Sequence, residues 1–99
     1  MQLLTIMLEE GYLDERVILK VNGTTVFDKE SVKTKLLLGF ADSVSINLQQ
    51  TSANIEISIP NKGMSLSLKV MLDSDKYIAF SVKNTTILHR ISNEPFVYL

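Results

Sequence analysis

Apolar residues occupy every second position in three stretches of the second half of the chain. The stretches comprise Val44, Ile46 and Leu48, then Ile55, Ile57 and Ile59, then Met64, Leu66, Leu68, Val70 and Leu72. Polar residues fill most of the positions between them. A period of two places alternate side chains on opposite faces of a β-strand. The pattern therefore predicts strands with one buried face, and it does not by itself indicate a function.

Short turn sequences separate these stretches from one another and from further predicted strands. Asn22 and Gly23 lie between two runs rich in valine and threonine, and both residues accept the positive φ angles of a two-residue hairpin turn. The other predicted turns are residues 60–63, 73–76 and 83–85. Each strand with its turn spans roughly ten residues, which is typical of a sandwich or barrel.

Residues 29–38 fit two kinds of secondary structure. Ser31 could cap a short helix that places Val32 and Leu36 on one face. A strand would instead bury the even-numbered positions from Val32 to Leu38, and the run of leucines suits a buried strand as well as a helix. We favour the strand because every neighbouring element is predicted to be β.

The predicted elements add up to eight or nine short strands, which indicates an all-β fold of two antiparallel sheets packed as a β-sandwich of immunoglobulin or transthyretin type. With only four glycines, the strands carry few kinks, so a strongly curved barrel is less favoured. A chain of 99 residues with 45% hydrophobic composition can bury a core. We therefore expect one domain over residues 1–99.

The charges disfavour two classes of partner. Acidic and basic residues are scattered singly and give a formal net charge of -1, so we expect neither nucleic acid nor a membrane surface as a partner. Cysteine is absent, which excludes disulfides and thiolate metal sites.

The apolar start of the chain lacks a basic segment and is followed at once by Glu9 and Glu10, so it does not fit a signal peptide. We expect a cytoplasmic protein.

The candidate residues for catalysis or metal binding are few. His89 is the only histidine, and a zinc site needs several nitrogen or sulfur ligands. An enzyme would have to combine His89 with a carboxylate such as Asp73 or Glu94. Asp73 and Asp75 flank a turn, but they fall short of the oxygen ligands that calcium requires. We predict no catalytic, metal or cofactor-binding residue and no cofactor.

Other polar and aromatic residues have structural explanations. Four carboxylates gather in the predicted loop region between the first strand and the hairpin: Glu9, Glu10, Asp14 and Glu15. Phe80 is in register with Ile78 and belongs to the predicted core, whereas Tyr77 and Tyr98 lie at strand ends where a phenol can stay hydrated. Tryptophan is absent, which weakens the case for a carbohydrate-binding surface without removing it.

Two segments could form interfaces. Residues 2–8 carry no charge, so they are our first choice for an oligomer contact at an unguarded sheet edge; the alternative is an ordinary paired strand. Residues 92–99 end in four apolar residues after a proline. Phe96 and Leu99 could close the end of the sandwich, or they could dock on a partner by strand addition.

Residues 17–29, with their Asn22-Gly23 turn, and the ending Ser92-Asn93-Glu94-Pro95-Phe96 resemble small uncharacterised bacterial β-sandwich proteins. The chain is more loosely similar to transthyretin-like and carboxypeptidase-regulatory accessory domains. Neither resemblance implies a catalytic residue. The sequence therefore favours a non-enzymatic β-sandwich that acts through protein contacts, as a homo-oligomer or an accessory partner. A module that binds a small ligand or carbohydrate is the alternative.

Overall fold

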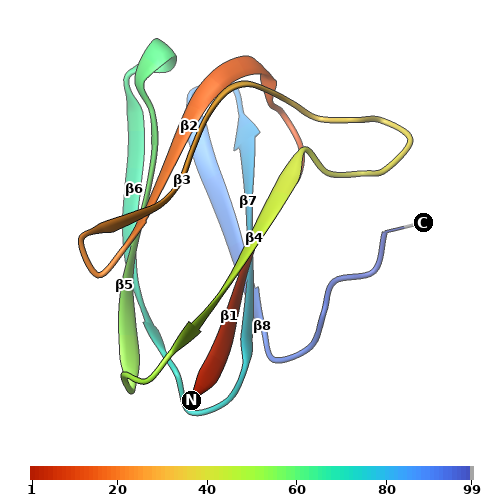
Figure 1. The fold of residues 1–99 in the computed structure, drawn as a ribbon. Helices are drawn as coiled ribbons and strands as arrows, with labels where there is room; N and C mark the ends of the chain where they lie inside the picture. Colours follow the sequence, from red (N-terminus) through yellow and green to blue (C-terminus); the bar gives the residue numbers. More distant parts are fainter. Residues whose placement is uncertain (99) are drawn as a thin grey trace.

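The structure, a computed structural model, describes residues 1–98 as strands joined by short connections (Figure 1). The elements are β1 (Gln2–Leu8), β2 (Leu13–Val21), β3 (Thr24–Lys33), β4 (Asp42–Leu48), β5 (Ser52–Ile59), the 3-10 turn η1 (Pro60–Lys62), β6 (Met64–Met71), β7 (Lys76–Lys83) and β8 (Thr86–Ser92). The eight strands confirm the predicted all-β class. None of the described segments is a helix long and apolar enough to cross a membrane.

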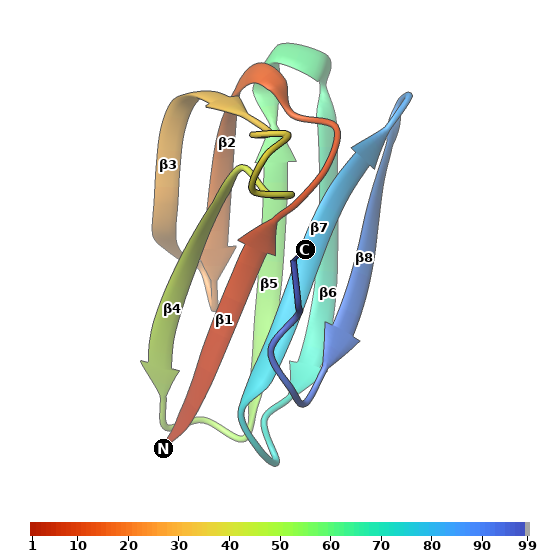
Figure 2. The ribbon, with the colours of Figure 1, turned by 90° about the vertical axis from the view of Figure 1, so that its right-hand side faces the viewer.

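The strands form two sheets of four, in the orders β4-β1-β7-β8 and β3-β2-β5-β6. β1 pairs with β7 in parallel, and every other pair of neighbouring strands is antiparallel. Figure 2 looks onto the first sheet, with the second sheet behind it. The two layers are separate sheets, so the chain forms the expected sandwich and not a closed barrel.

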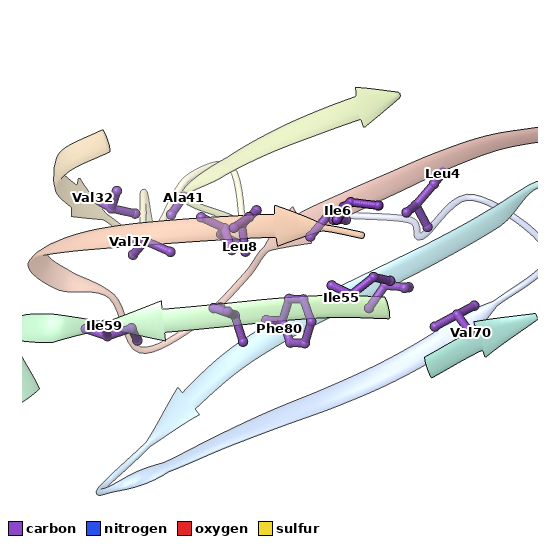
Figure 3. Close-up of a cluster of buried hydrophobic side chains, with 14 of the residues drawn as sticks. Leu4, Ile6, Leu8, Val17, Val32, Ala41, Ile55, Ile59, Val70 and Phe80 are labelled. Atoms are coloured by element: carbon purple, nitrogen blue, oxygen red, sulfur yellow. The ribbon is translucent and has the colours of Figure 1, made fainter. Parts of the chain in front are cut away.

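The apolar stripes meet between the two sheets (Figure 3). The inward residues of the inner strands β1, β2, β5 and β7 are almost fully buried, among them Leu4, Ile6, Leu8, Val17, Leu19, Ile55, Ile57, Ile59, Ile78 and Phe80. Their equivalents on the edge strands β4 and β6 are only partly buried, except for Val70 on β6, which is buried. An edge strand has a neighbour on one side alone, so the same alternating pattern removes less of its surface from water.

The predicted turns are confirmed. Asn22 and Gly23 both have positive φ angles, 51° and 80°, and close the β2–β3 hairpin. Residues 60–63 form η1 and a left-handed Gly63 between β5 and β6. Residues 84–85 connect β7 and β8, with Asn84 at a positive φ of 57°.

Two expectations about individual segments are wrong. β1 (Gln2–Leu8) is an interior strand with β4 on one side and β7 on the other, so it offers no sheet edge for an oligomer. Within residues 29–38 the strand ends at Lys33, and residues 36–38 belong to an exposed turn. The helix is absent from this described segment as well, because the chain here leaves one sheet to enter the other.

Candidate functional site

Residues 34–41 connect β3 to β4, and we call them the leucine loop. Leu36 and Leu37 are the most exposed large apolar side chains of residues 1–98, at 92% and 99%, and the neighbouring Leu38 is 48% exposed. Figure 1 shows the loop projecting from the body of the sandwich. Single exposed apolar residues are normal, but a contiguous group on a projecting element is a candidate interaction surface.

The backbone of the leucine loop holds itself in a tight turn. The amide of Lys35 donates to the carbonyl of Phe40 at 3.2 Å, which makes an isolated antiparallel bridge across the loop. The amides of Leu38 and Gly39 both donate to the carbonyl of Lys35, at 3.0 and 2.9 Å. These bonds form a small hairpin with the leucines at its apex, so the exposure of the leucines belongs to a defined turn.

Both ends of the loop are fixed to the segment that follows β1. The Thr34 hydroxyl donates to the carbonyl of Glu9 at 2.8 Å and accepts a hydrogen bond from the amide of Tyr12 at 3.1 Å. The Thr34 amide donates to the carbonyl of Tyr12 at 2.9 Å. At the other end, the amide of Ala41 donates to the carbonyl of Leu8 at 2.6 Å. The loop therefore projects from an anchored base.

The C-terminal segment supports this base from the outside. The rings of Tyr98 and Phe40 lie 5.1 Å apart between centroids, and a side chain on Gly39 would meet the Tyr98 ring at 3.3 Å. Figure 2 shows the segment crossing in front of β7 and ending near the loop. The tail thus docks on its own chain, over the outer face of a sheet. Leu99 lies outside the described residues.

A buried carboxylate holds the tail in place. Glu9 accepts hydrogen bonds from Arg90, at 3.2 Å from Nε and 2.6 Å from Nη2, and from the Tyr98 hydroxyl. Arg90 also lies over the Phe96 ring, 4.1 Å from its centroid, a favourable cation–π geometry. Burial, and then the hydrogen bond to Glu9, raise the pKa of Tyr98, so its hydroxyl remains a donor.

A hollow of about 720 Å³ lies beside the leucine loop, between the end of β3 and the start of β4. The buried side chains of Val32 and Ala41 belong to its lining, together with the loop leucines. Ser31 also lines the hollow and has a positive φ of 56°. That backbone conformation is costly for a residue other than glycine, and such residues cluster at ligand sites.

The charged residues around the hollow are mostly basic. Lys29 forms an ion pair with Asp42 at 2.8 Å. Partial burial acts to raise the pKa of Asp42, but hydrogen bonds from Lys29 and the Ser43 amide, with the nearby charge of Lys35, bring that pKa below its usual value. Asp42 is thus a charged partner for lysine. Within residues 1–98, neither Lys33 nor Lys35 forms an ion pair.

The residues that the sequence singled out for chemistry do not come together. His89 lies exposed on the edge strand β8, opposite Phe80. Asp73 pairs with Lys76 at 3.0 Å, and Asp75 accepts a hydrogen bond from the amide of Leu3 at 2.8 Å. Within residues 1–98 no three His, Asp or Glu side chains are placed to hold a metal ion.

The acidic loop region divides into separate structural roles. Glu9 binds the tail, whereas Glu15 accepts hydrogen bonds from the amides of Leu13 and Asp14, at 2.6 and 2.7 Å, and pairs with Lys62 at 2.7 Å. These side chains stabilise the connection from β1 to β2 and its contact with η1. Because these carboxylates have structural roles, the leucine loop and its hollow remain as the candidate site.

Sequence reasoning missed this site because leucine is normally taken as a core residue. The available signal was Gly39 directly after the leucine run, with Lys33 and Lys35 before the run, which is a turn-like setting. In comparisons with known proteins, no family model and no curated protein matches this sequence.

Proposed function

We propose that this β-sandwich is a non-enzymatic protein that acts through contacts with other proteins, and that the leucine loop is its contact element. The observation that carries the proposal is the outward display of Leu36 and Leu37 by a hydrogen-bonded turn. Exposed apolar groups on a defined turn are suited to burial by a partner. A cytoplasmic accessory role, like that of the sandwich domains the sequence resembles, belongs to the same proposal.

The energetics favour a specific contact of moderate strength. Full burial of one leucine side chain contributes about 1.5–3 kcal/mol, so Leu36 and Leu37 together supply roughly 3–6 kcal/mol. Association costs at least about 4 kcal/mol in lost freedom. The two leucines therefore need further contacts, which the hollow and its lysines can provide. Because the turn is preformed, little additional ordering is required.

Site-specific photocrosslinking tests the proposal in cells that naturally produce the protein. A benzophenone amino acid at position 37 should give a discrete adduct with one protein, identified by mass spectrometry. The same probe at Met71, which is 59% exposed on β6, the edge strand at the other side of the sheet from β3, is the matched control and should not give that adduct. Excess wild-type protein should compete with the adduct, and the Leu36→Ser/Leu37→Ser variant should not.

The proposal would be refuted if position 37 gave no protein adduct, or if positions 37 and 71 gave identical adducts. Circular dichroism checks that the double serine variant is folded. Substitution of side chains this exposed should change the free energy of unfolding by no more than about 0.5 kcal/mol. A loss of binding in the double serine variant therefore cannot be attributed to unfolding.

The second candidate function is binding of a small ligand or carbohydrate. The volume of the hollow, about 720 Å³, falls within the range of small-molecule sites. A specific ligand must raise the melting temperature by mass action. A thermal-shift screen that finds a ligand whose effect disappears on substitution of Ala41 by a larger residue, such as Ala41→Met, would favour this candidate over protein contact.

A further inference from the structure

The leucine loop joins two edge strands. β3 is the last strand of one sheet and β4 is the last strand of the other, so this side of the sandwich is open between the layers. The hollow lies at one end of that open side, and its lining includes residues from both strands and from the loop. An extended peptide could therefore reach an apolar hollow, a projecting leucine tip and a free strand edge together.

Charge determines the chemistry of a peptide that fits here. Lys29, Lys33 and Lys35 line the hollow with a single carboxylate, Asp42. This local excess of positive charge contrasts with the formal net charge of -1 of the whole chain. Complementary charge steers a partner to a surface and selects among partners. A segment with aspartate or glutamate beside its apolar residues is complementary to this surface.

A second copy of the chain is a poorer occupant. A symmetric contact places the same patch of both copies together, so the lysines of one hollow would face those of the other. The loop is also small compared with the roughly 800 Å² that each partner contributes to a typical stable interface. A peptide that follows the hollow and the edge of β3 avoids both difficulties.

The backbone of Ser31, which lines the hollow, has an unusual conformation. Its φ of 56° lies in the left-handed region, and it occurs where the pairing of β2 with β3 changes register, close to Val32. A conformation of this cost persists where the surrounding structure enforces it, often at binding sites. Here it falls within the lining of the hollow.

We infer that the hollow beside the leucine loop binds a short acidic peptide segment of a partner protein. One apolar side chain of the segment enters the hollow against Val32 and Ala41, the loop leucines cover it, and its carboxylates pair with Lys33 and Lys35. This inference rests on the proposed function and specifies the partner's chemistry.

Selection from a random 12-residue peptide library displayed on phage tests the inference on the intact protein. The wild-type protein should enrich peptides that combine Asp or Glu with Leu, Ile, Phe or Met. The Lys33→Glu/Lys35→Glu variant should instead enrich peptides with Lys or Arg beside the same apolar residues. The matched control is Lys69→Glu/Lys83→Glu, which changes two exposed lysines on other strands and should keep the acidic preference.

The most enriched peptide is then synthesised, and its affinity is measured by fluorescence anisotropy. Reversal of Lys33 and Lys35 should weaken binding roughly tenfold or more, since two attractive charge contacts become repulsive. Raising the salt concentration should weaken the wild-type complex because exposed charge pairs are screened. The Leu36→Ser/Leu37→Ser variant should lose binding.

The outcomes separate this inference from the proposed function. Enriched peptides without an acidic bias, or an unchanged preference in the lysine variant, would overturn the inference and leave the crosslinking result standing. The inference would also be overturned if the wild-type protein enriched peptides no more strongly than the double serine variant does. So would a leucine-dependent dimer in sedimentation velocity, or leucine-dependent binding to phosphatidylglycerol vesicles without peptide enrichment, since the occupant would then be a second copy or a lipid surface.

Discussion

Substitution of Gly11 by alanine should be one of the most destabilising single changes in this protein. Gly11 lies between β1 and β2, has a φ of +90°, and passes directly against the backbone of β7. A Cβ atom at this position would lie 1.9 Å from the Val82 oxygen and 2.8 Å from the Val82 carbonyl carbon. These neighbours are backbone atoms, so a side-chain rotation cannot relieve the overlap.

Three contributions set the size of the effect. The left-handed backbone costs an L-residue about 1–2 kcal/mol. Displacement of β7 adds about 1–3 kcal/mol, as overpacking of an interior does. Movement of Val82 also strains its amide hydrogen bond to the Glu10 carbonyl, which is 2.8 Å long and is worth about 0.5–1.5 kcal/mol. The expected loss is therefore roughly 3–6 kcal/mol, a large part of the stability of a small domain.

Gly63→Ala is the matched control. Gly63 also has a positive φ, +60°, but a Cβ there would meet nothing within 4 Å. The decrease in the free energy of unfolding for Gly63→Ala should stay near the backbone cost alone, about 1–2 kcal/mol. Urea denaturation followed by circular dichroism measures both variants against the wild type. If Gly11→Ala lies within about 1 kcal/mol of Gly63→Ala, the close approach to β7 contributes little, and this reasoning is falsified.

Two further predictions concern buried polar groups. Tyr12→Phe removes a hydrogen bond of 2.9 Å to the Phe80 carbonyl, and this carbonyl still accepts a second hydrogen bond from the Glu9 amide. Urea denaturation should therefore show a decrease of about 0.5–1.5 kcal/mol in the free energy of unfolding. A decrease above about 3 kcal/mol would contradict this account of the bond. Burial acts to raise the pKa of Glu15, but hydrogen bonds from Lys62 and two backbone amides outweigh burial and lower that pKa below its ordinary 4.5. The stabilisation by Glu15 is then present above its unfolded-state pKa and is lost as the pH falls through its folded-state pKa. The wild type should therefore lose stability on acidification more steeply than Glu15→Gln, and parallel pH profiles would count against this ion pair.

The sandwich itself could be predicted from the sequence because a strand with one buried face has apolar residues at every second position. The order of the strands could not, since it depends on contacts between distant residues. Residues 2–8 illustrate the limit. Leu4, Ile6 and Leu8 face the core, while Leu3 and Met7 are half-buried on the opposite face. An apolar run without alternation is typical of a strand covered on both sides, and the absence of charge was interpreted as an unguarded edge instead.

The contacts that support the candidate site were beyond sequence reasoning for the same reason. Glu9 and Arg90 are 81 positions apart, and no local pattern pairs them. The leucine loop was missed because apolar character predicts burial only on average. Leu36 fits a helix face, a strand face or a turn equally well, and only the path of the chain from one sheet to the other decides among them.

Leu36 and Leu37 at the apex of the loop contribute almost nothing to folding, and this distinguishes them from the buried leucines of the strands. Leu37 is 99% exposed in the folded protein, so folding removes almost none of its surface from water and gains almost no hydrophobic free energy from it. The loop is held instead by backbone hydrogen bonds and by Thr34, Phe40 and Ala41, which contact Tyr12, Tyr98 and Leu8. Polar residues at the apex would leave all of these contacts intact. The fold therefore accounts for the position of the turn but not for Leu36 and Leu37 at its apex, and this is the gap that the proposed contact with a partner would fill.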